Sequence, residues 1–429
     1  MSNKIGFVSL GCPKNLVDSE RIITRLCAEG YEIVGSYDEA DLVIINTCGF
    51  INPSIGESCE VIEEALEING NVLVTGCLGA KAKFVSDKYP DLVAVTGPHA
   101  YEDVMQAVNK VIPAPHQRDF SLLPPQGVRL TPSHYSYLKI AEGCSHRCSF
   151  CIIPQLRGDM VSRNPDEIIA EAETLVEAGV RELMVVAQDT SAYGLDLKKS
   201  GIETNLYDLC DDLSDLGVWV RVHYMYPYKN VDSVIELMAE RKILPYLDIP
   251  FQHSNPRILE LMKRPAYKED ILQRVMRWRE ICPDLAIRSS FIAGFPGETE
   301  AEFADLMQFL AEAKLDRVGC FAYSDVDGAK ANHLPNPVDE DEKHDRVERV
   351  MLQQAQISRD KLEQKVGITT DVIVDDITED QLICRSMWDA PEIDGQVFVD
   401  LVDGIEVGDI VPVLIDTSDE HDLWGKVAE

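Results

Sequence analysis

Positive charge is scarce in this chain of 429 residues. Lys and Arg number 40 against 74 Asp and Glu, so the formal net charge is −34. Phosphate backbones are bound through Lys and Arg, and a surface of the opposite sign repels them. The same field would attract a basic protein partner, although acidity can also serve solubility alone. The charge balance therefore disfavours nucleic acid as a partner.

Long apolar runs are also missing. No stretch approaches the ~20 apolar residues that span a bilayer. The chain does not open with a charged segment followed by an apolar one, as a secretory signal would. We therefore expect a cytoplasmic protein without a membrane anchor. Because thiols stay reduced in that compartment, the 12 cysteines indicate metal binding or catalysis rather than disulfides.

Internal repeats and low-complexity tracts are absent, and four segments of different character follow one another. Residues 1–112 alternate buried-strand and amphipathic-helix patterns, which predicts a doubly wound α/β domain. Residues 113–134 contain five prolines, which is typical of a stiff linker. Residues 135–365 carry six βα units, which predict a barrel or partial barrel. Residues 366–429 show short β patterns between Gly and Asp turns, which predict a small all-β barrel.

The expected elements follow from apolar periodicity. In residues 1–112 we expect strands at Ile5–Leu10, Leu42–Ile45, Val72–Val74 and Leu92–Val95, and helices at Val17–Cys27 and Val61–Ile68. In residues 135–365 we expect strands at Tyr137–Ala141, Glu182–Ala187, Val218–His223, Leu247–Phe251, Ala286–Phe291 and Asp316–Phe321, closed by a helix from Val338 to about Lys365. In residues 366–429 we expect strands at Thr370–Val374, Gln381–Arg385, Gln396–Leu401 and Ile410–Ile415.

Cys144, Cys148 and Cys151 form a CxxxCxxC motif directly after the first strand of the βα series. A 4Fe–4S cube normally takes four thiolates. Three on one loop leave an open iron, which can chelate the amine and carboxylate of a molecule such as S-adenosylmethionine (SAM). A redox pair or half of a zinc knuckle is the competing interpretation. A structural zinc site usually adds a fourth ligand nearby, and His146, inside the loop, is poorly spaced for zinc.

This motif in this place resembles the radical SAM superfamily. The resemblance implies that the cluster donates an electron to bound SAM. SAM then breaks into methionine and a 5′-deoxyadenosyl radical, which abstracts hydrogen from an unactivated carbon. Phe150, just before the last cysteine of the motif, could pack against the adenine ring, and Arg147 could tune the cluster from outside its ligand shell.

Cys12, Cys48 and Cys77 are far apart in sequence, but each follows a predicted strand: KIGFVSLGC, DLVIINTC and NVLVTGC. The ends of parallel strands share one edge of a sheet, so the three thiols can converge. Glycines adjoin all three cysteines and permit close backbone approach. A buried cysteine is often only a small apolar side chain. We interpret the other six cysteines in that way: Cys27, Cys59, Cys210, Cys282, Cys320 and Cys384.

The two cysteine sets together resemble the methylthiotransferase family of radical SAM enzymes. That family combines an N-terminal three-cysteine domain, a central radical SAM domain and a C-terminal β-barrel called TRAM, and the resemblance covers essentially the whole chain in this order. It implies that Cys12, Cys48 and Cys77 hold a second 4Fe–4S cluster, which handles the inserted sulfur. It also implies a small electron donor such as a flavodoxin or ferredoxin.

Polar and glycine residues follow other predicted strands of the βα series. Gln188, Asp189 and Thr190 are suited to contact a ribose or the substrate, and the resemblance favours SAM; a helix N-cap is the alternative. Gly294 would let the backbone approach a ligand, although a plain strand–turn–helix joint explains it nearly as well. Arg288 could pair with the carboxylate of SAM.

Three further polar residues have no assigned role. Gln252 and His253 follow a strand, but a lone histidine is more often structural. Lys139 lies on the first strand of the βα series, and the pattern does not tell which way it points.

Two features bear on the substrate. Residues 366–429 contain 17 acidic residues and only two basic ones, for a net charge of −15. A tRNA-binding barrel should instead carry a basic face. In addition, Gly11–Glu20 reads GCPKNLVDSE, which is similar to the branch that modifies a ribosomal protein (the RimO type). The tRNA branch (the MiaB type) typically has Gln-Met where Pro13 and Lys14 stand.

The resemblance then implies methylthiolation of the β-carbon of one aspartate in the small-subunit ribosomal protein numbered twelve. One SAM would methylate a sulfur held at the N-terminal cluster, and a second SAM would supply the radical. Two alternatives remain: a tRNA adenosine methylthiotransferase with the same cysteine chemistry, and a non-enzymatic zinc- or cluster-bearing ribosome-binding module.

Overall fold

The computed structural model describes residues 3–264 and 270–428, which form two compact units. The first unit comprises the chain up to Pro132, Tyr137–Val161 and Ser324–Ala329. The second comprises Ser133–Ser136, Ser162–Tyr323 and the chain from Lys330 on. The segment with the CxxxCxxC motif therefore belongs to the same unit as the three dispersed cysteines.

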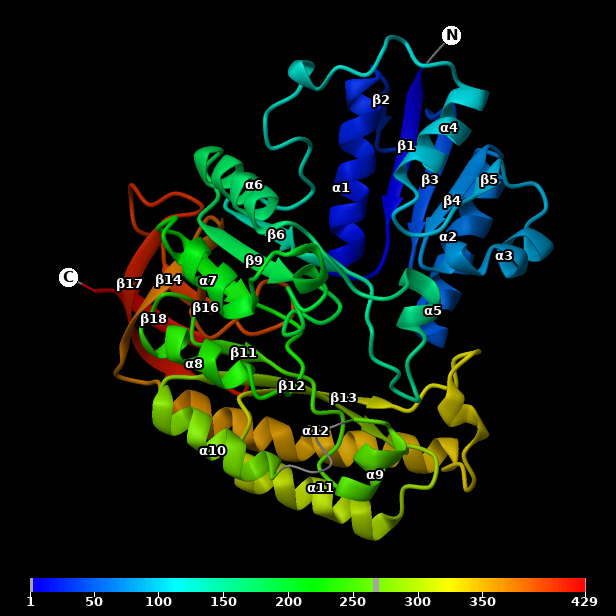
Figure 1. Cartoon of the computed structure of the whole chain (residues 1–429). Coiled ribbons are helices and arrows are strands. Elements are labelled where there is room, and N and C mark those ends of the chain that lie inside the picture. Colours follow the sequence, from blue (N-terminus) through cyan, green and yellow to red (C-terminus); the bar gives the residue numbers. More distant parts are fainter. Residues whose placement is uncertain (1–2, 265–269, 429) are drawn as a thin grey trace. The chain divides into compact units, whose positions relative to one another are not determined.

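The first unit is built on a parallel sheet with the strand order β2-β1-β3-β4-β5 (Figure 1). Its strands are β1 (Lys4–Ser9), β2 (Glu32–Val34), β3 (Leu42–Thr47), β4 (Val72–Gly76) and β5 (Ala94–Val95). Its main helices are α1 (Pro13–Ala28), α2 (Asn52–Ile68), α3 (Ala82–Lys88), α4 (Tyr101–Val111) and α5 (Ile153–Arg157). Short 3-10 turns occur at η1 (Leu78–Lys81) and η2 (Phe120–Leu122).

Alternate residues of β3 face opposite sides of this sheet. Leu42 and Ile44 pack in one apolar cluster with residues of α1 and α4. Val43 and Ile45 pack in another with residues of α2 and α3. Because a strand buried on both faces must be apolar throughout, this arrangement explains the continuous apolar run, and it confirms the doubly wound α/β fold.

The order of the strands creates a switch point in the first unit. β1 pairs with β2 on one side and with β3 on the other, so the chain turns away from the β1–β3 boundary in both directions. In open α/β sheets ligands bind outside the carboxyl ends of the strands at such a boundary. Cys12 and Cys48 follow the two strands that flank it.

The second unit contains a sheet whose order, β13-β12-β11-β10-β9-β6, follows the sequence. Its strands are β6 (Tyr135–Lys139), β9 (Glu182–Val186), β10 (Trp219–Val222), β11 (Tyr246–Asp248), β12 (Ala286–Ala293) and β13 (Arg317–Ala322). β6 begins in the second unit and continues into the first. The strands from β9 to β13 pair in parallel. This open sheet confirms a partial (β/α) barrel.

Helices accompany the strands of this sheet in the expected alternation. They are α6 (Pro165–Glu177), α7 (Leu206–Ser214), α8 (Val231–Ala239), α9 (Pro256–Leu261), α10 (Ile271–Ile281), α11 (Glu300–Ala313) and α12 (Glu340–Glu363), with 3-10 turns at η3 (Leu197–Ser200) and η5 (Lys330–His333). α12 is the charged helix predicted to close the series. A two-residue pair, β7 (Ala141–Glu142) with β8 (Val161–Ser162), brackets the CxxxCxxC loop.

The chain ends in a closed five-stranded barrel, shown in orange to red in Figure 1. Its strands are β14 (Thr369–Ile377), β15 (Gln381–Ser386), β16 (Val397–Asp400), β17 (Ile410–Ser418) and β18 (Leu423–Val427). Val372, Leu382 and Val413 are among the residues that fill its core. The predicted all-β barrel is confirmed.

A buried carboxylate ties the barrel to the βα sheet. Glu182 opens β9 and is fully buried. Its Oε1 lies 2.7 Å from Nε of Arg221 on β10, and its Oε2 lies 2.7 Å from Nη2 of Arg385 on β15. Arg385 also pairs with Asp375 of β14. Charges this deep are tolerated only when paired, so the ion pairs fix the barrel against the sheet.

None of the helices in the described residues combines the length and the apolar character needed to cross a membrane.

Candidate functional site

The three dispersed cysteines occupy equivalent positions at one edge of the first unit's sheet. Cys12 follows β1 and is the N-cap residue of α1. Cys48 follows β3, and Cys77 follows β4. The strand ends meet: the N–H of Cys77 donates at 2.9 Å to the carbonyl of Thr47, the residue before Cys48, and a Cβ built on Gly11, the residue before Cys12, would lie 3.2 Å from Sγ of Cys48.

Two glycines make this convergence sterically possible. Gly11 adopts a φ of +90°, and a Cβ built on it would lie 2.9 Å from Cβ of Cys48. Gly76 adopts a φ of +88°, and a Cβ there would lie 2.3 Å from Oδ1 of Asn46. Positive φ and the absence of a side chain are both properties of glycine, so the strand ends pack closely only with glycine at these positions.

Asn15 in the first turn of α1 connects two of the cysteine-bearing strand ends. Its Nδ2 donates to the carbonyl oxygen of Leu10 at 2.7 Å and to that of Thr47 at 3.1 Å. Leu10 lies two residues before Cys12, and Thr47 immediately precedes Cys48. Because Asn15 is buried, these hydrogen bonds are protected from water and fix the two segments together.

Arg157 connects the end of the CxxxCxxC segment to the edge of the sheet that carries the dispersed cysteines. It is the last residue of α5, and its side chain is 1% exposed. Its Nε donates to Sγ of Cys77 at 3.1 Å, and its Nη2 donates to Oδ1 of Asn15 at 2.8 Å. Sequence reasoning did not identify Arg157 or Asn15.

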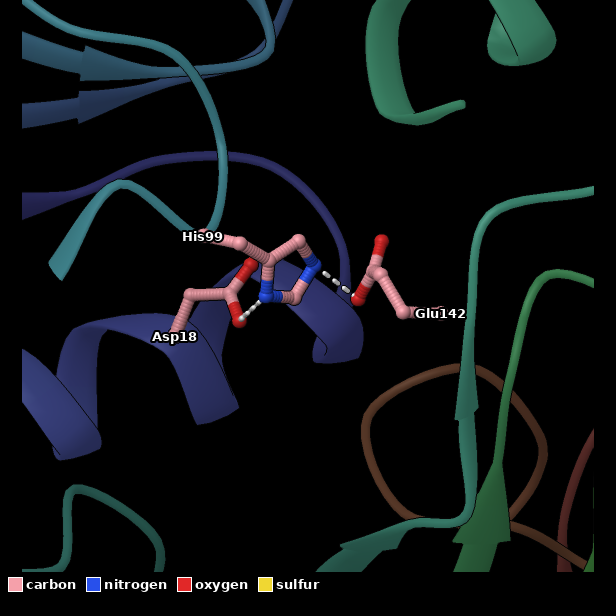
Figure 2. Close-up of side chains that lie close together, drawn as sticks. All are labelled: Asp18, His99 and Glu142. Carbon is pink, nitrogen blue, oxygen red and sulfur yellow. Dashed lines mark ion pairs between the residues drawn. The ribbon is translucent and has the colours of Figure 1, made fainter. Parts of the chain in front are cut away.

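The remaining donor group of Arg157 meets a buried ion network. Its Nη1 lies 3.1 Å from Oδ2 of Asp18 and 2.8 Å from Oε1 of Glu142. Lys139 forms ion pairs with the same two carboxylates. His99 lies between these carboxylates and pairs with both (Figure 2). The unassigned Lys139 therefore points into this network.

Asp18, His99 and Glu142 offer atoms within 4.8 Å of one another, close enough to share a metal ion. However, the two carboxylates already face two cations, Lys139 and Arg157, so their charge is balanced. A divalent ion would have to displace one of these cations. Burial raises the pKa of Asp18, but Lys139 and Arg157 outweigh it and hold the pKa below its usual value. We therefore interpret the group as an ion network that orients Arg157.

The three thiols differ in their environments. Burial raises the pKa of Cys12, but Lys14, Arg157 and backbone N–H groups at the start of α1 outweigh it, so the pKa lies below the usual value. Burial raises the pKa of Cys77 to about 11 despite Arg157, and it raises that of Cys48 as well. Metal ligation takes the thiolate form, and a cluster iron would offset the desolvation of the two buried thiols.

The CxxxCxxC loop is held by backbone contacts. Cys144 and Cys148 are each 9% exposed. The N–H of Cys144 donates to the carbonyl of Gly158 at 3.1 Å, and that of Cys151 donates to the carbonyl of Cys148 at 3.2 Å. Arg147 is half exposed and pairs with Asp159 across the loop, while Phe150 is half buried. Three thiols on one ordered loop fit a cluster with one open iron.

The polar residues after β9 make structural hydrogen bonds. The hydroxyl of Thr190 is buried and donates to the carbonyl of His223 at 2.8 Å. Oδ1 of Asp189 accepts from the hydroxyl of Ser191 at 2.6 Å. Gln188 is half buried at the carboxyl end of β9. Thr190 and Asp189 thus shape the loop, and Gln188 is the most exposed of the three residues.

Gly294 and Arg288, both predicted to lie at the SAM site, contact other parts of the protein. Gly294 has a φ of +72°, but a Cβ there would lie 2.3 Å from Cγ of Lys343 on α12, so helix packing alone requires glycine. The ion pairs of Arg288 favour a structural role over the predicted contact with the carboxylate of SAM. Arg288 lies near the amino end of β12, and it pairs with Asp248 at 3.1 Å and Asp394 at 3.5 Å. Its guanidinium serves the sheet and the C-terminal barrel.

Gln252 and His253 follow β11. Gln252 has a φ of +73° and forms an isolated parallel bridge with Phe291. His253 is fully buried, its Nδ1 accepts from the N–H of Asn255 at 2.9 Å, and its Nε2 lies 3.6 Å from Oε2 of Glu298. This environment favours the structural interpretation of the histidine.

The other six cysteines lie in or beside helices and strands. Cys59, Cys210, Cys282, Cys320 and Cys384 are buried, and Cys27 is half buried. Burial raises the pKa of Cys210, of Cys320 and of Cys384, each to about 12. The burial of five of these thiols fits their interpretation as apolar side chains.

Family models match three parts of the chain. The Radical SAM superfamily matches residues 138–310, the TRAM domain matches residues 366–428, and a family described as "Uncharacterized protein family UPF0004" matches residues 4–97. The central match contains Cys144, Cys148 and Cys151, and the N-terminal match contains Cys12, Cys48 and Cys77.

Similar proteins cover nearly the whole chain. The ribosomal protein uS12 methylthiotransferase RimO of Proteus mirabilis is 57% identical over 434 residues, which span 99% of this chain and 98% of that protein. Its namesakes from Hahella chejuensis and Legionella pneumophila (strain Paris) are each 56% identical. They span 99% and 100% of this chain, respectively, and 99% of each of those proteins.

Solved structures share the fold at low sequence identity. The radical S-adenosylmethionine methyltransferase TsrM of Kitasatospora setae, with cobalamin and a [4Fe-4S] cluster bound, aligns with a TM-score of 0.54 and 14% identity over 75% of both chains. The cobalamin-dependent S-adenosylmethionine radical enzyme OxsB aligns with a TM-score of 0.50 and 10% identity over 83% of this chain and 56% of that one.

Proposed function

The chain belongs to the RimO family of radical SAM methylthiotransferases, and we propose that it adds a methylthio group to the β-carbon of an aspartate in ribosomal protein uS12. The observation that carries the proposal is the gathering of two three-cysteine sets in one compact unit. A methylthio insertion needs a place for radical generation and a place for sulfur, and each set supplies one.

In this proposal Cys144, Cys148 and Cys151 hold a 4Fe–4S cluster with SAM on its open iron, and Cys12, Cys48 and Cys77 hold a second cluster. When bound, the first cluster and SAM supply an electron and a 5′-deoxyadenosyl radical. Close backbone packing of Gly143 against Gly158 holds the loop that carries Cys144, Cys148 and Cys151. Phe150 packs against adenine, and a flavodoxin or ferredoxin serves as electron donor.

SAM contacts beyond the loop come from the carboxyl ends of strands. Gln188 after β9 is the foremost residue for a polar contact, since Asp189 and Thr190 position its loop. Gly294 after β12 shapes the edge of the sheet through its contact with α12.

The charge of the C-terminal barrel supports a basic protein substrate over tRNA. Ten acidic residues in its described part, which ends at residue 428, are exposed: Asp371, Asp376, Glu379, Asp380, Glu392, Asp400, Asp403, Glu406, Asp409 and Asp416. Of its two basic residues, Arg385 is buried and Lys426 pairs with Asp416 at 2.8 Å. Such a surface repels phosphates and attracts the Lys- and Arg-rich surface of a ribosomal protein.

A competition experiment tests the proposal. The reconstituted enzyme receives SAM and reductant without oxygen, together with uS12 and an anticodon-loop RNA that bears the modified adenosine. Mass spectrometry then follows one added methylthio group. We expect the gain on an aspartate of uS12. A gain on the RNA alone would overturn the substrate assignment, and formation of 5′-deoxyadenosine with a gain on neither would refute the proposed substrates while sparing the radical chemistry.

A further inference from the structure

Arg157 is a buried cation that joins the two cysteine-bearing segments through hydrogen bonds. It lies six residues after Cys151, on the helix that follows the CxxxCxxC loop. Its Nε donates to Sγ of Cys77 at 3.1 Å. One buried cation thus links the chain that carries the first cysteine set to a ligand of the second.

Arg157 contacts Cys77 directly and is linked to the chain before Cys12 and Cys48 through Asn15. Through Nη2 it holds Oδ1 of Asn15. The amide nitrogen of Asn15 in turn holds the carbonyls of Leu10 and Thr47, just before Cys12 and Cys48. The N–H of Cys77 donates to the same Thr47 carbonyl at 2.9 Å. The guanidinium and the Asn15 amide therefore fix the relative positions of the three strand ends.

The ion network explains why this position takes arginine. Asp18 and Glu142 accept from Nη1, and Asn15 accepts from Nη2. These three acceptors hold the guanidinium plane, so the Nε–H is aimed at the sulfur. A lysine would bring the charge but only one nitrogen, and it would lack the planar fork.

We propose that Arg157 is a positioning residue that sets the reduction potential of the cluster on Cys12, Cys48 and Cys77 and ties that cluster to the CxxxCxxC segment. The inference rests on the proposed function, since it requires a cluster there. Hydrogen bonds to ligand sulfurs and nearby positive charge stabilise the more negative, reduced form of an iron–sulfur cluster. Arg157 supplies both from a site that water does not reach.

The test isolates one cluster. In a Cys144→Ala, Cys148→Ala, Cys151→Ala parent, only the second cysteine set can bind iron. Arg157→Gln, Arg157→Lys and Arg118→Gln are added singly, and iron content, circular dichroism and an EPR-monitored redox titration are measured. Arg118 is the matched control because it pairs with Glu29, beyond the far end of the 16-residue α1, roughly 24 Å from Cys12.

We expect a more negative midpoint potential in Arg157→Gln than in the parent, a smaller shift in Arg157→Lys, and none in Arg118→Gln. Loss of iron from both Arg157 variants with an unchanged dichroism spectrum would equally support the positioning role. An unchanged potential at full iron content, or iron loss that accompanies unfolding, would overturn it. A parent that binds no iron would instead refute the second cluster of the proposed function.

Discussion

Gly11 has a backbone conformation that lets the chain before Cys12 approach Cys48. Its φ of +90° and the 2.9 Å from a built Cβ to Cβ of Cys48 leave no room for a side chain. We predict that Gly11→Ala lowers stability by about 1–3 kcal/mol, the cost of a strained backbone position. It should also lower iron loading of the second cysteine set, measured in the background that lacks the CxxxCxxC thiols.

Gly35→Ala is the matched control for this change. Gly35 lies after β2 in the same unit, and a Cβ there would meet nothing within 4 Å. Equal loss of iron in both variants would show that the Gly11 contact is not specific to the cysteine site.

Arg288 allows a test between a structural role and a contact with SAM. Its side chain is 22% exposed and pairs with Asp248 and Asp394. Removing one partner of such a pair leaves uncompensated charge, so Arg288→Gln should destabilise the protein by about 3 kcal/mol. SAM affinity, measured by equilibrium binding to the folded variant, should be unchanged. The exposed pair of Arg241 and Asp284 gives the control, since Arg241→Gln should cost less than about 1 kcal/mol.

Among single residues, the sequence predicted the cysteine ligands but not the polar residues that hold them in place. Three cysteines stand out because each follows a predicted strand, and the other three stand out because they lie on one short loop. Asn15, Asp18 and Arg157 carry no such motif. One signal was present: Asn15, Asp18 and Ser19 lie on the same face of α1 as the apolar Ile22 and Leu26 and are buried with them. Polar residues on a buried helix face must find partners, but the pattern does not say which.

At the level of elements, the start of β9 holds a pH-sensitive ion pair. Burial raises the pKa of Glu182, but Arg385 and Arg221 outweigh it, and the pKa falls to about 2 from 4.5. The stabilisation is therefore complete above about pH 4.5 and is lost as the pH falls towards 2. The gap corresponds to roughly 3 kcal/mol.

We predict that the free energy of unfolding of the full chain, measured with guanidinium, falls by roughly 3 kcal/mol between pH 6 and pH 2 because Glu182 becomes protonated. Glu182→Gln should be less stable at pH 6, and its deficit should shrink on acidification. Glu67 of α2 is exposed, so the stability of Glu67→Gln should change with pH in the same way as that of the unchanged chain. A deficit that stays constant with pH would show that the carboxylate charge is not what stabilises the joint.

Most strands were predictable because their composition is extreme. The central strands are continuous apolar runs, and the predicted and observed ranges differ by a few residues at their ends. β2 and β18 were not predicted, because three residues in β2 and the mixed LWGKV of β18 give little periodicity. Without β2 the strand order could not be derived. The switch point that explains why Cys12 and Cys48 meet therefore emerged only from the structure.

At the scale of the molecule, we propose that the distribution of charge selects the partner. Asp376, Glu379 and Asp380 are exposed around the β14–β15 turn. Replacing all three by lysine should weaken uS12 binding about tenfold at low salt, because the barrel would lose its attraction for a basic surface. The difference should shrink as salt screens the charges. Titration calorimetry at two salt concentrations measures both.

The same change of charge on α2 provides the control. Glu57, Glu60 and Glu67 are exposed there, and their replacement by lysine should alter uS12 binding much less. Equal weakening by the two triple variants would mean that net charge, rather than the barrel, steers the substrate.

The division of labour between the two cysteine sets is the central claim, and one measurement tests it most directly. A Cys12→Ala, Cys48→Ala, Cys77→Ala variant is supplied with SAM, reductant and uS12, and both 5′-deoxyadenosine and methylthio-uS12 are quantified. We predict that 5′-deoxyadenosine still forms while methylthio-uS12 does not, whereas the Cys144→Ala, Cys148→Ala, Cys151→Ala variant forms neither. Methylthio-uS12 made by the first variant would contradict the account.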